Sequence, residues 1–215
     1  MTTTRTRVAI IGAGPAGLLL SHLLDQAGID SIVIDERGRE EIETTIRAGI
    51  LEQGTVDVLA SSGASPRITT EANKHDGIEL RFAGSGHRID FPSLTGRSVF
   101  LYPQHEVLKD LIAVRLAAGQ DLRFGVRAER VDGAETDRPR VIATDADGAS
   151  LEIEADFVVG ADGSRSVARA AVTGSMTGGY FREYPFAWFG ILTEAPPSAE
   201  ELIYSNSPNG FALIS

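Results

Sequence analysis

The chain has 215 residues, of which 42% are hydrophobic, and a formal net charge of −10. This composition excludes a disordered chain, and the negative charge argues against nucleic acids and anionic membrane surfaces as partners. The sequence holds no cysteine, which excludes disulfides and thiolate chemistry, and its four histidines show no metal-ligand spacing, so we expect no metal site.

The sequence pattern also gives no sign of a targeting signal or a membrane span. The apolar run near the N-terminus is broken by Gly12 and Gly14, which is not typical of a signal peptide. No stretch approaches the roughly 20 apolar residues that a membrane-spanning helix needs. We therefore expect a cytoplasmic protein with no membrane partner.

The first predicted elements are a strand, a helix and a second strand. Val8–Ile11 is continuously apolar, as is typical of a buried parallel strand, and it runs directly into a glycine-rich turn. The helix is predicted from Pro15 to about Ala27, and the second buried strand spans Ser31–Ile34. Together they make a βαβ unit of about thirty residues.

The glycine-rich turn predicts a dinucleotide site. In Gly12-x-Gly14-x-x-Gly17 the first glycine allows the tight turn, the second lets the backbone approach a pyrophosphate, and the third lets the helix pack closely on the sheet. The helix N-terminus offers unpaired N–H groups to the phosphates. Asp35 and Glu36 stand where an acidic side chain accepts hydrogen bonds from ribose hydroxyls. This pattern alone leaves FAD, NAD and a turn that only packs a helix as alternatives.

The middle of the chain alternates between predicted hairpins and predicted helices. The patterns predict a helix toward the end of 45–60, a hairpin of Gly77–Phe82 and His87–Phe91, a helix over Glu106–Ala118, and a hairpin of Arg138–Thr144 and Ser150–Val159.

A second glycine turn, GADGSRS, follows the last of these strands and precedes a helix predicted from about Ser164. Asp162 is placed to contact a ribose or an ordered water near a pyrophosphate, and Gly163 supplies backbone freedom. Arg165 and Arg169 are four residues apart, which puts them on one face of the predicted helix. The alternative is a plain strand–helix turn with a solvated arginine face.

The C-terminal part of the chain differs in character from the start. From Met176 the sequence is rich in aromatic residues, and we expect Trp188 and its neighbours to lie in a domain core. Two short strands, Glu201–Ser205 and Phe211–Ser215, flank Asn209-Gly210 and predict antiparallel sheet. Because the chain ends inside an apolar strand, we expect it to be the front part of a longer protein.

Two glycine turns of this kind in one chain resemble the flavoprotein monooxygenases. Three segments narrow the resemblance to flavoprotein aromatic hydroxylases that act on 4-hydroxybenzoate: RAGILEQGTVDVL from Arg47, YPFAWFGIL from Tyr184, and ELIYSNSPNGFALIS from Glu201. The similarity covers essentially the whole chain, but only about the first half of such an enzyme. It implies an α/β fold, with a Rossmann-like FAD-binding domain and its parallel sheet over 1–73 and 97–175, and part of an antiparallel substrate-binding sheet domain over 74–96 and 176–215.

The resemblance assigns cofactor contacts by position. Arg47 would meet the FAD pyrophosphate and approach NAD(P)H, and Gln104 would touch the flavin side of the FAD chain. Arg165 and Arg169 would help NAD(P)H to reach the flavin, while the segment that begins at Asp162 would serve FAD and NAD(P)H together. From the residues alone, Arg47 and Gln104 are equally compatible with surface positions.

Two positions depart from the family pattern near the expected coenzyme contacts. Thr45 stands where the family usually has another arginine, which would weaken anion contacts. Glu36 would repel the 2′-phosphate of NADPH and favours NADH, whereas nearby Arg37 and Arg39 oppose that preference. Both coenzymes therefore remain candidates.

The resemblance also assigns residues to the substrate. Tyr204 would hydrogen-bond the phenol oxygen, His75 would be the solvent end of a proton relay that starts at the phenol, and Ser215 would contact the substrate carboxylate. The alternatives from the residues alone are half-buried packing for Tyr204 and an exposed histidine without a role for His75.

The implied reaction is FAD-dependent hydroxylation of 4-hydroxybenzoate to 3,4-dihydroxybenzoate, with O2 and NADPH or NADH as co-substrates. The family suggests a homodimer. The alternatives are a monooxygenase of another phenol, a catalytically silent FAD-binding fragment, and an NAD-binding dehydrogenase domain. The Asp-Gly segment and the second sheet argue against the dehydrogenase.

Overall fold

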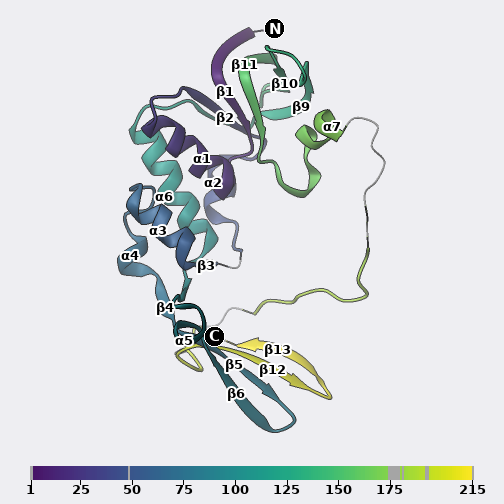
Figure 1. Cartoon of the computed structure of the whole chain (residues 1–215). Coiled ribbons are helices and arrows are strands. Elements are labelled where there is room, and N and C mark those ends of the chain that lie inside the picture. The colour runs from purple at the N-terminus through teal and green to yellow at the C-terminus, as the bar shows by residue number, and fades with distance from the viewer. Residues whose placement is uncertain (1, 48, 174–179, 181, 192–193, 215) are drawn as a thin grey trace. The chain divides into compact units, whose positions relative to one another are not determined.

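The computed structural model describes residues 2–47, 49–173, 180, 182–191 and 194–214, and the chain forms two compact units (Figure 1). Unit 1 comprises Met1–Asn73 and Leu101–Gly174, and unit 2 comprises Lys74–Phe100 and Ser175–Ser215. The chain leaves unit 1 at the short strand β4 (Asn73–His75) and returns to it at β7 (Val99–Leu101).

Unit 1 is built around a six-stranded sheet with the order β8-β2-β1-β11-β10-β9. The central strand β1 pairs in parallel with β2 on one side and with β11 on the other, and β8 is parallel to β2. In contrast, β10 is antiparallel to both of its neighbours. This sheet confirms the predicted α/β class. Its strands are β1 (Thr2–Ile11), β2 (Ser31–Asp35), β8 (Leu122–Phe124), β9 (Arg127–Asp132), β10 (Arg140–Thr144) and β11 (Ser150–Gly160).

The register of β1 and β11 brings the two glycine turns together. Val8 lies beside Phe157 and Ile11 lies beside Gly160, so the two parallel strands end at the same edge of the sheet. The turns that follow Ile11 and Gly160 therefore start next to each other. In open α/β sheets, ligands bind outside this edge, at the carboxyl ends of the strands.

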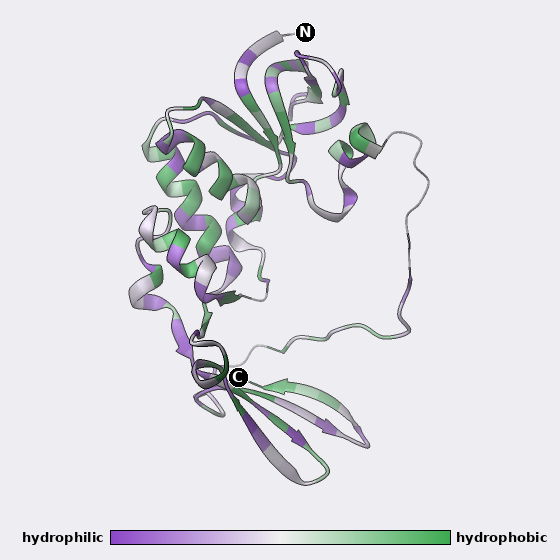
Figure 2. Cartoon of the chain, in the orientation of Figure 1, coloured by the Kyte–Doolittle hydropathy of each residue, from purple (hydrophilic) through white to green (hydrophobic). Residues whose placement is uncertain are grey.

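Two long helices of unit 1 pack against each other: α1 (Pro15–Gln26) and α6 (Gln104–Ala117). Each buries one side, with Leu18 of α1 and Leu111 and Ile112 of α6 almost inaccessible to solvent. Figure 2 shows the corresponding hydrophobic and hydrophilic patches along both helices. The remaining elements of unit 1 are α2 (Arg39–Thr44), β3 (Ile50–Glu52), α3 (Gln53–Ser61), α4 (Ile68–Glu71), the 3₁₀ turn η1 (Gly163–Arg165) and α7 (Val167–Thr173).

Unit 2 contains a four-stranded sheet with the order β13-β12-β5-β6. The two predicted hairpins are present as β5 (Gly77–Phe82) with β6 (Ser85–Asp90), and as β12 (Leu202–Ser207) with β13 (Gly210–Ile214). However, β12 runs parallel to β5, so the sheet is not antiparallel throughout. The long connection between the hairpins permits this pairing, which a tight turn would not. A short helix, α5 (Phe91–Thr95), follows β6.

The expectation that Trp188 lies in a domain core is wrong. Residues 182–191 form neither helix nor strand, and Trp188 is 74% exposed. Its ring packs edge-on against the ring of Phe211, with the two ring centroids 5.6 Å apart. Trp188 therefore lies on the surface of the β12–β13 hairpin. Among the helices that the structure describes, none has the length and apolar character that crossing a membrane requires.

Candidate functional site

The first glycine turn has a backbone shape that only glycine allows. Gly12 has a φ of +108°, and a Cβ there would lie 2.6 Å from the carbonyl carbon of Ala161 in the second turn. A side chain is also excluded at Gly17, because a Cβ there would overlap the Gly12 carbonyl oxygen and lie 3.2 Å from Ile10 Cγ2. The Gly12 amide donates to Ile34 O at 2.8 Å, which fixes the turn to β2. The two glycine turns therefore pack backbone against backbone, and together they are called the cradle below.

The N-terminus of α1 faces this cradle without a covering side chain. Gly14 occupies the N-cap position in an extended conformation, and within the described residues it makes no side-chain capping hydrogen bond. Pro15 begins the helix, and its first turn carries no acidic residue. Unpaired N–H groups at a helix N-terminus, together with the helix dipole, favour an anion such as a phosphate.

A cleft of about 680 Å³ opens at this edge of the sheet in unit 1. Its size is within the range of small-molecule and cofactor sites. Of the predicted cofactor residues, Gly17 and Arg169 are not among the described residues that line the cleft. The others all line it: Gly12, Gly14, Asp35, Glu36, Arg47, Gln104, Asp162, Gly163 and Arg165.

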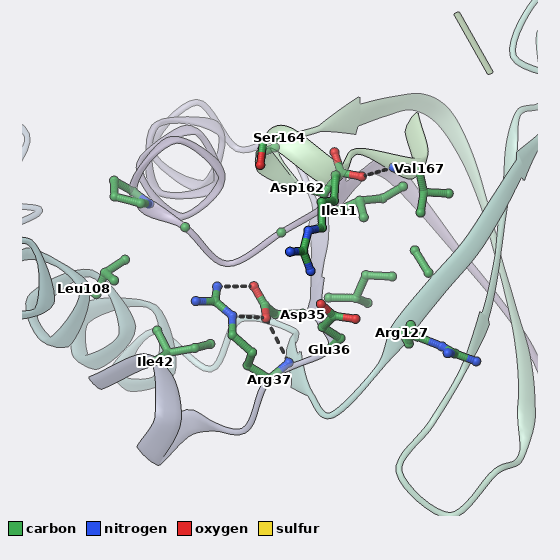
Figure 3. A pocket seen from close by; sticks show the side chains of 18 of the residues that line it. Ile11, Asp35, Glu36, Arg37, Ile42, Leu108, Arg127, Asp162, Ser164 and Val167 are labelled. Atoms are coloured by element: carbon green, nitrogen blue, oxygen red, sulfur yellow. Dashed lines mark hydrogen bonds and ion pairs between the residues drawn. The ribbon is translucent and has the colours of Figure 1, made fainter. Parts of the chain in front are cut away.

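The two acids after β2 have different surroundings. Asp35 is only 6% exposed, and its carboxylate accepts a hydrogen bond from Ala13 N at 2.7 Å. It also accepts hydrogen bonds from Arg37 Nε and NH2, both at 2.9 Å (Figure 3). Burial raises the pKa of Asp35, but the hydrogen bonds from Arg37 and Ala13 outweigh it and hold the pKa below its usual value. Glu36 is exposed to the cleft, which leaves its carboxylate open to a ligand hydroxyl.

Asp35→Asn is expected to lower the free energy of unfolding at neutral pH by roughly 1–2 kcal/mol, since the hydrogen bonds from Arg37 lose their charged acceptor. The pKa of Asp35 is depressed in the folded state, so its contribution to stability is present above the unfolded value of 3.8 and is lost as the pH falls below it. Thermal unfolding from pH 7 to pH 3 should show wild type and variant converging as the pH falls. A constant difference would contradict this assignment.

The second glycine turn is organised by Asp162. Its carboxylate accepts hydrogen bonds from Val167 N at 2.6 Å and from Ser166 Oγ at 2.7 Å, so it caps α7 (Figure 3). The helix predicted from about Ser164 therefore begins only at Val167, after the separate η1 turn. Asp162 thus ends the second glycine turn and binds the first amide groups of α7 through local hydrogen bonds.

The predicted shared helix face of Arg165 and Arg169 is consequently wrong, because the two side chains belong to different elements. Arg165 ends η1 and lines the cleft. The Arg169 guanidinium donates hydrogen bonds to Ser164 O and Gly163 O, both at 3.1 Å. These hydrogen bonds stabilise the second glycine turn. Of these two arginines, Arg165 is therefore the one that lines the cleft.

The cleft carries further arginines: Arg47, which the resemblance assigns to the FAD pyrophosphate, and two others, of which Arg127 was not expected from the sequence. Arg47 is exposed at the cleft, and Arg37 and Arg127 also line it. Gln104 lies at the first position of α6, where its side chain shares the cleft with the helix N-terminus. Arg127 follows a turn after the three-residue strand β8, and such a short strand leaves no sequence pattern from which its position could be found.

The predicted substrate residues Tyr204 and His75 belong to unit 2, and Ser215 lies outside the described residues. Tyr204 is half-buried in β12, with its ring centroid 6.2 Å from that of Phe211. His75 is 6% exposed, and its buried Nδ1 has no hydrogen-bond partner among the residues described. The structure therefore corrects the expectation that His75 lies at a solvent-exposed end.

A charged pair lies in the same unit as His75. Arg88 Nε and NH2 donate to the two carboxylate oxygens of Glu201 at 2.7 and 2.8 Å. These hydrogen bonds hold the pKa of Glu201 below its usual value, although burial acts in the opposite direction. Glu201 is therefore a fixed anion immediately before β12, three residues before Tyr204. No group of three or more histidine or acidic side chains suited to a metal ion occurs in the described part of the chain.

Residues 5–215 match the family described as FAD binding domain. The chain is 40% identical over 216 residues to the p-hydroxybenzoate hydroxylase of Acinetobacter baylyi, which covers 100% of this chain and 53% of that protein. It is 29% identical over 195 residues to the 3-(3-hydroxy-phenyl)propionate/3-hydroxycinnamic acid hydroxylase of Burkholderia cenocepacia, which covers 86% of this chain and 34% of that protein.

A solved structure gives the same picture of the fold. The flavin-dependent monooxygenase PieE, in complex with FAD and substrate, matches with a TM-score of 0.65 and 26% identity, over 80% of this chain and 32% of that one. The chain thus spans about half, or about a third, of the length of these relatives.

Proposed function

The chain belongs to the FAD binding domain family, and from this premise we propose that it binds FAD in the unit 1 cleft and hydroxylates 4-hydroxybenzoate to 3,4-dihydroxybenzoate with NAD(P)H and O2. One observation carries the proposal: two glycine turns meet beside the uncapped N-terminus of α1 in a cleft of cofactor size. When bound, FAD supplies the redox chemistry that passes electrons from NAD(P)H to O2.

The residues of the cleft suit the diphosphate of such a cofactor. Gly12 and Gly14 line the cleft with bare backbone, so no side chain at these positions stands in the way of a phosphate, and the first turn of α1 offers N–H donors. Arg47 and Arg165 add positive charge, and a guanidinium can hold a phosphate through two hydrogen bonds. The carboxylates of Asp35 and Asp162 are engaged by the protein itself, and that of Asp35 is neutralised by its ion pair with Arg37.

Other residues of the cleft serve the two ends of the cofactor. We assign the ribose hydroxyls of the adenosine part to Glu36, the exposed acid at the end of β2, with Asp35 holding the turn beneath it. Gln104 would contact the flavin side. An exposed acid at Glu36 also disfavours a 2′-phosphate, which supports NADH, whereas Arg37 and Arg39 support NADPH, so either coenzyme serves as the reductant in this proposal.

In unit 2, Tyr204 would donate a hydrogen bond to the phenol oxygen of the substrate and favour its ionised form. An ionised phenol makes the ring a better nucleophile for hydroxylation. His75 would take part in moving the phenol proton, since its buried Nδ1 has no partner among the described residues. Ser215 would contact the substrate carboxylate.

A second candidate is hydroxylation of a different phenol. It is favoured by the similarity to a hydroxylase of 3-(3-hydroxy-phenyl)propionate, in which the acid is carried on a longer side chain. NAD(P)H oxidation measured with a series of phenolic acids separates the two. Stimulation by 4-hydroxybenzoate together with formation of 3,4-dihydroxybenzoate supports the first proposal. FAD binding without any stimulated oxidation would instead indicate a catalytically silent FAD-binding chain.

Arg47→Lys is expected to weaken FAD binding roughly tenfold, because lysine keeps the charge but loses the bidentate hydrogen bonds of the guanidinium. Quenching of flavin fluorescence on titration with protein measures the affinity. Arg130→Lys is the matched control, since Arg130 is an exposed arginine of the same unit that does not line the described cleft. If wild-type protein binds no FAD, the proposed function fails; if the two variants bind alike, only the Arg47 contact is refuted.

A further inference from the structure

A buried polar cluster is centred on a residue of α6 that lies one to two helical turns after Gln104. Its centre is Asp110, which is 6% exposed. The carboxylate accepts hydrogen bonds from Ser65 Oγ, from Arg67 Nε at 2.7 Å and from Tyr102 OH at 2.9 Å. None of these four residues is among the described residues that line the cleft. A carboxylate that is buried with its donors satisfied holds all of them in fixed positions.

Tyr102 is the member of the cluster nearest in sequence to the cleft. It is 2% exposed, and both burial and the hydrogen bond to Asp110 raise the pKa of its hydroxyl above the usual value. The hydroxyl therefore stays protonated at working pH and donates to a charged acceptor. Hydrogen bonds of this kind are stronger than those between neutral groups.

The backbone of Tyr102 is joined to a second segment of the cleft. Its N–H donates to Gly49 O at 2.8 Å. A Cβ at Gly49 would overlap the Tyr102 carbonyl and lie 2.5 Å from Pro103 Cα, so the two segments touch backbone to backbone. Arg47 stands two residues before Gly49, and Gln104 stands two residues after Tyr102. Both of these side chains line the cleft.

We propose that Tyr102, anchored by Asp110, is a positioning residue that fixes Arg47 and Gln104 at the cofactor cleft. The inference rests on the proposed function, because it concerns the same FAD site. Tyr102 does not touch the cofactor itself. It sets the place of two segments that do, through one side-chain hydrogen bond and one backbone hydrogen bond.

The cluster offers its own control. Ser65 donates to the same Asp110 carboxylate, but its backbone N–H donates to Leu59 O, so it belongs to the connection between α3 and α4. Removing either hydroxyl takes one donor from Asp110. Only the Tyr102 hydroxyl anchors a residue whose backbone joins the segments of Arg47 and Gln104, so only its loss is expected to loosen them, while the hydrogen bond from Tyr102 N–H to Gly49 O remains. A purely structural role predicts that FAD affinity follows stability equally in the two variants.

The test compares Tyr102→Phe with Ser65→Ala in the whole chain, with FAD affinity measured by titration and stability by thermal unfolding. Both variants should unfold at a lower temperature. Tyr102→Phe should weaken FAD binding about tenfold, which corresponds to the loss of one charge-assisted hydrogen bond, while Ser65→Ala should bind within about twofold of wild type. In a Gln104→Ala background, Tyr102→Phe should cost less FAD affinity than it does alone, since one of the positioned groups is absent.

A second pair of variants covers the case in which Tyr102→Phe does not fold. Asp110→Asn keeps an oxygen that can accept from Tyr102, whereas Asp110→Ala does not, so the asparagine variant should retain more FAD affinity than the alanine variant. Equal FAD affinity of Tyr102→Phe and Ser65→Ala, or of the two Asp110 variants, overturns the inference and leaves the proposed function standing. A wild-type chain that binds no FAD overturns both.

Discussion

Replacing Gly12 with alanine is expected to abolish detectable FAD binding and to destabilise the fold by roughly 2–4 kcal/mol. The residue has a φ of +108°, which an L-amino acid with a Cβ rarely adopts. The added Cβ would also lie 2.6 Å from the Ala161 carbonyl carbon and 2.9 Å from Asp162 N, so the second glycine turn would have to move. One methyl group thus acts on both turns that form the cradle.

Urea unfolding and FAD titration of the Gly12→Ala chain measure the two effects. Gly54→Ala is the matched control, because Gly54 is exposed in α3 and a Cβ there would meet no described atom within 4 Å. Alanine in a helix is favoured over glycine by up to about 1 kcal/mol, so this variant should be at least as stable as wild type and bind FAD normally. A Gly12→Ala chain with wild-type affinity for FAD would remove the turn from the cofactor site.

Tyr204→Phe is expected to lower the rate of hydroxylation about 100-fold, a size typical of losing one proton-handling group, while FAD affinity stays unchanged. The substitution removes only the hydroxyl group of the Tyr204 side chain. The ring stays between its strand neighbours Leu80 and Leu213 and keeps its contact with Phe211. A substrate phenol without this hydrogen bond ionises less readily, so its ring is a weaker nucleophile.

The measurement is formation of dihydroxylated product per NAD(P)H consumed, as a function of pH. Raising the pH should restore part of the rate of Tyr204→Phe, because the substrate then ionises without help. Tyr184→Phe removes a hydroxyl from the exposed segment of the same unit and should leave the rate unchanged. Equal rates for wild type and Tyr204→Phe at neutral pH would refute the role of Tyr204 in ionising the substrate.

The first helix and the second strand could be predicted closely from the sequence, whereas the first strand, predicted over Val8–Ile11, already begins at Thr2. The helix predicted from Pro15 to about Ala27 is found over Pro15–Gln26, and the second strand ends one residue later than predicted, at Asp35. Here every local signal agrees: an apolar run, a glycine turn, a proline at the helix start and an acid after the second strand. The cleft at this turn follows from the same signals.

Other parts depend on contacts between residues far apart in sequence. Strands of three residues, such as β8, carry too few positions for a pattern. The late start of α7 has a local cause instead, because it depends on which nearby amide groups Asp162 caps. The Asp110 cluster joins Ser65 to a residue 45 positions away, and neither residue type indicates this. The burial of His75 and the exposure of Trp188 depend in the same way on what packs around them.

The pairing of β1 with β11 has a consequence for the order of events during synthesis. The cradle needs Gly12 from one end of unit 1 and Ala161 to Val167 from the other, with Ile11 and Gly160 in register. A nascent polypeptide that has not yet emerged as far as Val167 has no complete cradle, however well its first βαβ unit has folded. Such long-range closure is slow compared with local helix formation. Cofactor capture is therefore a late event, which follows the emergence of nearly all of unit 1 from the ribosome.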